Sequence, residues 1–532
     1  MRIFSVALLL IFVFGAKAQL PYKYRVFLTD KQENSGLLTK PDQLLSTRAL
    51  ARRAHHEVSV DSTDLPVSAS YVKALAEAGF PFVCASRWFN SVVVASADEK
   101  AAAALASLPF VREARLVWKD NGVQPSFFVK EDTLRRSKRA QENPALIQLT
   151  ALHGDQLHRA GYRGEGMQIA VLDAGFLNAD KIEAFNGKIL GTHDFVDPSG
   201  DIYATHPHGT NVLSVMAFTP SPIFSGTAPN ASYWLLRTED SSSEYPVEED
   251  YWIAAAEYAD SLGVDIINSS LGYNVFDDAT MNYQVEQVDG KSAYITRGAS
   301  MAASKGILVV NSAGNDGARL WRMLTFPADS RDILTVGAVD PAFNAAAFSG
   351  HGFLSKGYVK PNVMGIGSPA FVINDQGALE SGSGTSFSTP AVAGLAACLW
   401  QSLPQLRSAE VIRLLEQSST QALTPDSLMG YGVPDVYLAY TQVTPLRVTT
   451  ASAYRLIPVD SLGGIWTIEG IDDPEFAGVL NVCNPAGRRV AHFSFTGNNP
   501  TFNLGTLEKG LYIISVQAPA VRFSQRIHLS GQ

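Results

Sequence analysis

Short apolar runs alternate with helical patterns between residues 145 and 441, and this alternation constrains the fold more than any other feature of the chain. The apolar runs are residues 167–173, 232–238, 264–270 and 307–314. Strands that are apolar along their whole length are typical of a sheet covered on both faces, and intervening helices indicate parallel connections. We therefore predict an α/β domain with a mostly parallel sheet and helices on both faces.

The regions on either side have different patterns. Residues 19–139 contain four short strand patterns and helical patterns at 41–54, 70–79 and 97–108, which predicts a small α+β domain. Its end runs into "EDTLRRSKRAQENPA", a polar, dibasic stretch without periodicity that we interpret as a cleavable surface linker. From residue 446 to 532 helical periodicity disappears, and the strand patterns predict a small all-β domain.

Residues 1–18 have the pattern of a secretory signal peptide. Arg2 precedes an apolar segment, and Ala16 and Ala18 form a small-x-small cleavage site. The apolar segment is too short to span a bilayer, and no later stretch is long enough. We expect a secreted or cell-surface protein that has no membrane span.

Charge and cysteine content exclude other classes. The net charge of −9 over 532 residues leaves no basic surplus for binding a phosphate backbone, so we expect no nucleic-acid partner. Three widely spread cysteines form neither a disulfide framework nor a zinc motif.

Four polar residues stand where predicted strands or loops meet helices and turns. Asp173 ends a strand, His208 begins a helix in "HGT", Asn315 follows a strand in "AGNDG", and Ser386 begins a helix after "SGSGT". Ligands collect at the carboxyl ends of parallel strands. Taken singly, such residues are more often helix caps or turn formers, but the chain order Asp, His, Ser is that of one serine protease triad.

The motifs around these residues resemble those of the subtilisin-like serine protease (subtilase) family. "VLDAG", "HGT" and "GTSFSTP" resemble its Asp, His and Ser motifs, and "NSSLG" and "AGNDG" its substrate-binding strand and oxyanion loop. "TVGAVD", "KPNVMGIG" and "GYGVPD" are further similarities. The resemblance covers about residues 145–441. It implies a subtilisin-like sheet and a secreted serine endopeptidase that cleaves proteins or peptides.

The resemblance also implies a role for each matching residue. Ser386 would be the nucleophile, His208 its base, Asp173 the group that orients the imidazole, and Asn315 a donor to the oxyanion. The residues expected to pair with the peptide backbone as an added strand are Ser270, Leu271 and Gly272. His206 is set aside because only His208 precedes Gly-Thr, and Ala174 departs from the hydroxyl residue that many members carry after the Asp.

The resemblance implies no cofactor for the chemistry and leaves structural calcium open. Residues 19–139 resemble, more loosely, the subtilase prodomain, which implies a zymogen inhibited by its own prodomain; the alternative is an unrelated binding module. Residues 446–532 resemble the C-terminal sorting domains of Bacteroidota type IX secretion cargo.

The sequence leaves one alternative function open and excludes another. A catalytically silent subtilase-fold binding protein stays open as the alternative, although all four chemical residues are present. An α/β-hydrolase esterase is excluded, because it needs G-x-S-x-G and the order Ser, Asp, His, whereas residue 388 is Ser and Ser386 comes last.

Overall fold

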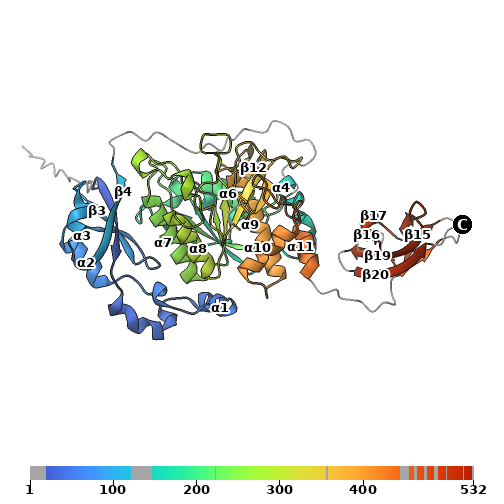
Figure 1. Cartoon of the computed structure of the whole chain (residues 1–532), viewed down its shortest axis with the longest axis horizontal. Coiled ribbons are helices and arrows are strands. Elements are labelled where there is room, and N and C mark those ends of the chain that lie inside the picture. The colour runs from blue at the N-terminus through green and yellow to red at the C-terminus, as the bar shows by residue number, and fades with distance from the viewer. Residues whose placement is uncertain are drawn as a thin grey trace, which may run out of the picture. The chain divides into compact units, whose positions relative to one another are not determined.

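The computed structural model describes residues 20–120, residues 146–443 apart from 222, 355 and 356, and residues 455–529 apart from 460–463, 472–475, 485–488, 499 and 519–520 (Figure 1). Two compact units divide at residues 440 and 441. The predicted signal peptide and the whole of the predicted linker lie outside the described residues.

A seven-stranded sheet forms the centre of the first unit. Its order is β11-β10-β9-β8-β5-β7-β6, and every neighbouring pair is parallel. The strands are β5 (Gln168–Asp173), β6 (Ile189–Asp194), β7 (Ser232–Arg237), β8 (Ile266–Ser269), β9 (Leu308–Ser312), β10 (Leu334–Val339) and β11 (Val363–Ile366). The predicted parallel sheet is confirmed.

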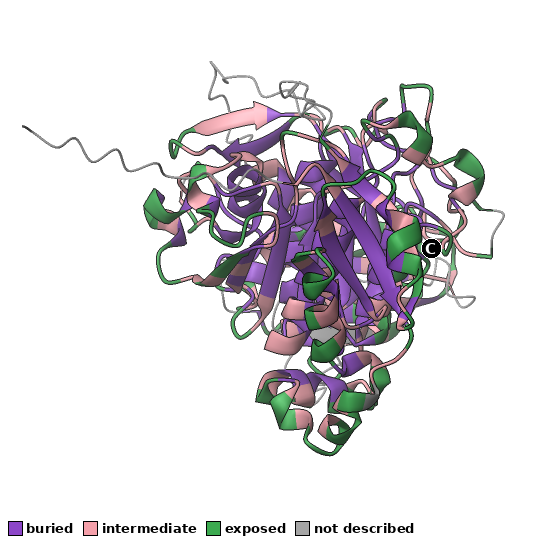
Figure 2. Ribbon diagram, turned by 90° about the vertical axis from the view of Figure 1, so that its left-hand side faces the viewer, coloured by how far each residue is buried: buried purple, intermediate pink, exposed green. Residues whose placement is uncertain are grey.

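Helices cover both faces of this sheet, as expected. On one face α6 (His208–Ala217) packs against α9 (Thr385–Ser402), and on the other α7 (Val247–Leu262) packs against α8 (Tyr294–Ser304). Every residue of strands β8 to β11 is buried, which explains why their sequences are mostly apolar (Figure 2). The remaining elements are α4 (Ile147–Thr150), α5 (Gly154–Arg159), α10 (Ser408–Gln417), α11 (Val436–Val443) and the hairpin of β12 (Ala370–Ile373) and β13 (Leu379–Gly382).

The N-terminal region is the predicted small α+β domain. Its antiparallel sheet has the order β2-β3-β1-β4, with strands β1 (Tyr22–Leu28), β2 (Phe82–Ser86), β3 (Ser91–Ser96) and β4 (Val111–Lys119). Its helices are α1 (Thr47–His55), α2 (Ala69–Glu77) and α3 (Ala101–Ala106). The single helix predicted over 41–54 is wrong, because Ser46 interrupts it: its Oγ accepts from the N–H of Ala49 at 3.1 Å and caps α1 there.

Buried charges join this N-terminal domain to α7. Arg25 of β1 donates two hydrogen bonds of 2.7 Å to the carboxylate of Asp250. Arg53 of α1 bridges Asp64 at 2.8 Å and Asp260 at 2.7 Å, and it is 1% exposed. A partner removed from such a pair leaves a buried charge uncompensated, so these contacts are specific to one docking geometry.

The second unit consists of strands in two antiparallel sheets, β14-β15-β18 and β17-β16-β19-β20. The strands are β14 (Arg455–Pro458), β15 (Ile465–Glu469), β16 (Ala477–Cys483), β17 (Arg489–Thr496), β18 (Thr501–Asn503), β19 (Gly510–Ala518) and β20 (Val521–Leu529). The all-β prediction is therefore confirmed for this part of the chain. Across the described residues of both units, no helix combines the length and apolar character needed to cross a membrane.

Candidate active site

The candidate site lies where the order of the central sheet reverses. After β5 the chain builds β6 and β7 on one side, and then it crosses to build β8 through β11 on the other. The carboxyl ends of β5 and β8 are thus adjacent. The chain segments that leave these two ends run in opposite directions, which opens a crevice at that edge of the sheet. Asp173 is the last residue of β5, and Ser270 directly follows β8.

His208 and Asp173 are in direct contact. His208 is the first residue of α6, and its Nδ1 donates to Asp173 Oδ1 at 2.7 Å. Gly175 and Gly209 allow this approach: a Cβ atom on Gly209 would lie 2.4 Å from the carbonyl oxygen of Gly175, and one on Gly175 would lie 2.1 Å from Thr205 Oγ1. The two glycines therefore let the start of α6 pack on the turn after β5.

Asp173 is completely buried, and one of its two carboxylate oxygens is better satisfied than the other. Oδ1 also accepts from the N–H of Ala174 at 2.8 Å. Oδ2 has no hydrogen-bond partner among the described residues. Ala174 carries no hydroxyl that could fill this position, so the departure from the family pattern coincides with an unpaired carboxylate oxygen.

Ser386 is held at the start of α9 by hydrogen bonds with Ser270. Pro390 has no N–H, so the carbonyl of Ser386 lacks its usual partner four residues ahead in the helix. Ser270 Oγ donates to that carbonyl at 2.9 Å, and Ser386 Oγ lies 3.4 Å from the Ser270 carbonyl. This links the end of β8 to the residue predicted to be the nucleophile.

The side chain of Asn315 is fixed by Thr385. Asn315 Oδ1 accepts from both the N–H and the hydroxyl of Thr385, each at 2.9 Å. Because the carbonyl end of the amide is engaged in this way, its NH₂ end is directed to the other side. The orientation suits a donor to an oxyanion formed near Ser386.

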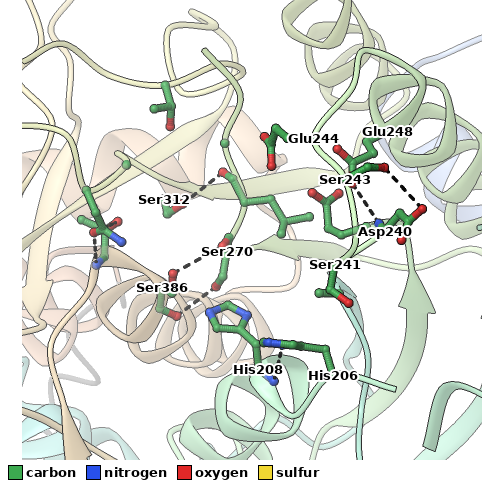
Figure 3. A pocket seen from close by; sticks show the side chains of 18 of the residues that line it. His206, His208, Asp240, Ser241, Ser243, Glu244, Glu248, Ser270, Ser312 and Ser386 are labelled. Atoms are coloured by element: carbon green, nitrogen blue, oxygen red, sulfur yellow. Dashed lines mark hydrogen bonds between the residues drawn. The ribbon is translucent and has the colours of Figure 1, made fainter. Parts of the chain in front are cut away.

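One cleft of about 120 Å³ brings the predicted residues together (Figure 3). Six of the seven line it directly: His208, Ser270, Leu271, Gly272, Asn315 and Ser386. The seventh, Asp173, lies buried behind His208. In Figure 3 the imidazole of His208 and the side chain of Ser386 face the same part of the cleft.

His206 also lines the cleft without contacting Asp173 in the way His208 does. Its Nδ1 accepts from the N–H of His208 at 3.2 Å. Burial, followed by the nearby charge of His208, lowers the pKa of His206. A neutral His206 keeps a second positive charge away from His208.

An acidic wall, not recognised in the sequence, forms another part of the cleft. Its carboxylates are Glu239, Asp240, Glu244, Glu248 and Asp277. Burial and the neighbouring Glu239 raise the pKa of Glu248 well above its ordinary value. The acid-rich stretch "TEDSSSEYPVEED" after β7 was the available signal, but its position beside the cleft depends on tertiary structure.

Among the described residues, no group of three or more His, Cys, Asp or Glu side chains is arranged to hold a metal ion. The chemistry available in the cleft is that of a hydroxyl, an imidazole, a carboxylate and an amide. These four groups are those needed for nucleophilic attack on a carbonyl and stabilisation of the resulting oxyanion.

Comparison with known proteins gives matches over both domains of the first unit. Residues 164–432 match the Subtilase family, and residues 23–136 match the Peptidase S8 propeptide domain of Bacteroidota. The chain is 28% identical over 273 residues to subtilisin DY of Bacillus licheniformis, which covers 51% of this chain and 89% of that protein. It is 29% identical over 298 residues to subtilisin E of Bacillus subtilis (strain 168), covering 55% and 70%.

Among solved structures, MycP1 from Mycobacterium smegmatis is similar at 22% identity with a TM-score of 0.47, covering 58% of this chain and 88% of that one. The match of the subtilase model spans half of the chain, and it includes all seven predicted site residues. The chain belongs to the subtilase family of serine peptidases, and it carries a propeptide domain of that family.

Proposed function

We propose that the protein is a secreted endopeptidase, made as a zymogen, that hydrolyses peptide bonds through Asp173, His208 and Ser386. The observation that carries the proposal is the 2.7 Å contact between His208 and buried Asp173 at a cleft that Ser386 and Asn315 also line. The general test is hydrolysis of a peptide library by the processed protein, compared with a Ser386→Ala variant.

The reaction would proceed in two halves. Ser386 Oγ attacks the peptide carbonyl while His208 Nε2 takes its proton, and the same proton then passes to the leaving amine. Asp173 holds His208 in the tautomer with a proton on Nδ1 and stabilises the imidazolium. Water, activated by His208, then hydrolyses the acyl-enzyme and returns Ser386 to its starting state.

The substrate backbone would lie along Ser270, Leu271 and Gly272. Leu271 is held in place through its carbonyl, which accepts from Asn311 Nδ2 at 3.2 Å and from Ser312 Oγ at 3.1 Å. A peptide added as a strand there gains affinity from main-chain hydrogen bonds.

Asn315→Ala should lower kcat by about 10²–10³ with little change in KM, because its amide would meet negative charge that exists mainly in the transition state. Steady-state kinetics on one peptide substrate measure kcat and KM separately. Asn344→Ala, in an exposed turn around Asp340, is the control and should leave both constants unchanged. An unaltered kcat in Asn315→Ala would mean that another group fills the oxyanion hole.

Inhibition by the propeptide domain is proposed from where β4 ends. Trp118 Nε1 donates to Ser243 Oγ at 3.3 Å, and Lys119 Nζ lies 2.8 Å from Asp278. Ser243 and Asp277, next to Asp278, line the cleft. The chain that leaves the propeptide domain therefore starts at the cleft, and cleavage beyond it would leave that domain bound beside the active site.

Arg25→Met should weaken retention of the cleaved propeptide domain by about 100-fold, because Asp250 would lose its buried partner from that domain at a cost of about 3 kcal/mol. Dilution of the cleaved complex, followed by the recovery of peptide hydrolysis, measures the release. Lys73→Met removes only an exposed pair with Glu77 and should release at the wild-type rate. Equal release by Arg25→Met and wild type would refute the anchoring role of Arg25.

Deletion of residues 446–532 should preserve peptide hydrolysis, since all seven predicted site residues lie in the first unit. The kcat/KM of the processed, truncated protein on a peptide substrate is the measurement. We propose that the deleted region serves delivery rather than chemistry; its role as a sorting domain stays a prediction. Loss of activity in a correctly folded truncated protein would show that it belongs to the catalytic unit.

A further inference from the structure

Thr325 closes one end of the cleft, between the two backbone segments that flank Ser386. It lines the cleft together with Gly272 and Gly314, and it is 1% exposed. A Cβ atom on Gly272 would lie 2.0 Å from Thr325 Oγ1, and one on Gly314 would lie 2.5 Å from the same atom. The threonine side chain therefore fills the space between these two glycines.

The backbone holds Thr325 in this position. Its N–H donates to the carbonyl of Ala313 at 3.2 Å, and its carbonyl accepts from Ala328 at 2.9 Å. The next residue, Phe326, exchanges two hydrogen bonds of 2.9 Å with Tyr273. A substrate side chain would thus meet a fixed obstacle and not a movable one.

The hydroxyl of Thr325 is buried and has no hydrogen-bond partner among the described residues. A buried hydroxyl without a partner is costly. Because Oγ1 faces Gly272 and Gly314, the side chain contributes bulk at the end of the cleft and offers no hydrogen bond to a substrate.

We infer that Thr325 restricts the substrate side chain immediately before the scissile bond to a small one, alanine or serine; this rests on the proposed function. With the reacting carbonyl between Ser386 and Asn315, that side chain enters between residues 270–272 and 312–315, where Thr325 ends the available space. An aromatic ring would be overpacked against Thr325, whereas the side chains of alanine and serine are short enough to fit in front of it.

The test uses the processed full-length enzyme and three peptides that differ only in the residue before the scissile bond, Ala, Ser or Phe. The wild type should cleave the Ala and Ser peptides at least about 10-fold faster, in kcat/KM, than the Phe peptide. Thr325→Gly should shift the ratio of Phe to Ala cleavage by about 10- to 100-fold in favour of Phe. Thr325→Val is the matched control, because it keeps the bulk and removes the hydroxyl: it should still exclude Phe, as the wild type does.

A wild-type enzyme that cleaves the Phe peptide as well as the Ala peptide would overturn the inference, whether or not Thr325→Gly folds. So would a Thr325→Gly enzyme with an unchanged ratio. Both outcomes leave the proposed function intact because peptides are still cleaved. Absence of any cleavage, together with no labelling of Ser386 by a fluorophosphonate, would instead refute the proposed function and this inference with it.

Discussion

Ser386→Ala is expected to yield a folded protein whose kcat for peptide hydrolysis is lower by about 10⁴–10⁶, the usual cost of removing one member of a triad. The side chain is buried, but its Oγ makes only a 3.4 Å contact with the Ser270 carbonyl, so little stability depends on it. The carbonyl that Ser270 Oγ caps belongs to the backbone and survives the substitution. Hydrolysis and thermal unfolding of the variant, measured beside wild type, separate the two effects.

The same variant should accumulate as an uncut precursor if maturation is self-cleavage between about residues 117 and 143. Ser388→Ala is its matched control, since Ser388 stands two residues later in α9 and its Oγ donates to the Thr385 carbonyl at 3.0 Å. The control should mature and hydrolyse peptides. A Ser386→Ala protein that reached mature size with no other protease present would contradict the self-processing model.

Asp173→Asn is expected to lower kcat by about 10⁴ while leaving the fold intact, since the two side chains have nearly the same shape. The carboxylate accepts the Nδ1 proton of His208, whereas an amide NH₂ would donate to that nitrogen. The imidazole proton would then sit on Nε2, which could no longer accept the proton of Ser386. The substitution therefore blocks the base without removing it.

Steady-state kinetics and a melting curve of the Asp173→Asn protein test this reasoning. KM should change little, because Asp173 is buried behind His208 and does not line the cleft. Asp197→Asn, in an exposed turn, is the control and should be as active as wild type. A fully active Asp173→Asn enzyme would show that His208 does not depend on this carboxylate.

The central sheet was predictable because its signal is local. Strands β5, β7, β8 and β9 are mostly apolar runs, and strands separated by helices are parallel in most proteins. The shared location of Asp173, His208 and Ser386 was likewise expected, from their chain order and from the resemblance of their motifs to those of the subtilase family. Those motifs also contain the glycines and the proline that the packing requires. Gly175 and Gly209 admit the close contact of α6 with the turn after β5, and Pro390 frees the carbonyl that Ser270 binds.

Features that depend on distant partners were not predictable. Helix α7 contains Glu249, Asp250 and Glu257, which its sequence alone would place in solvent, yet all three are buried. The partner of Asp250 is Arg25, 225 residues earlier in the chain, and no local pattern records that pairing. The role of Thr325 was not predictable either, because it depends on the position of this side chain between Gly272 and Gly314 in the folded structure.

The most direct test of the proposed site is covalent labelling of the processed protein with a fluorophosphonate probe, with the modified residue located by mass spectrometry. We expect a single modified serine, Ser386, because it is the proposed nucleophile and lines the same cleft as His208, the proposed base. The label should be absent from Ser386→Ala, strongly slowed in Asp173→Asn, and present in Ser388→Ala. Labelling of a different residue, or undiminished labelling of Ser386→Ala, would contradict the assignment of Asp173, His208 and Ser386 as the catalytic residues.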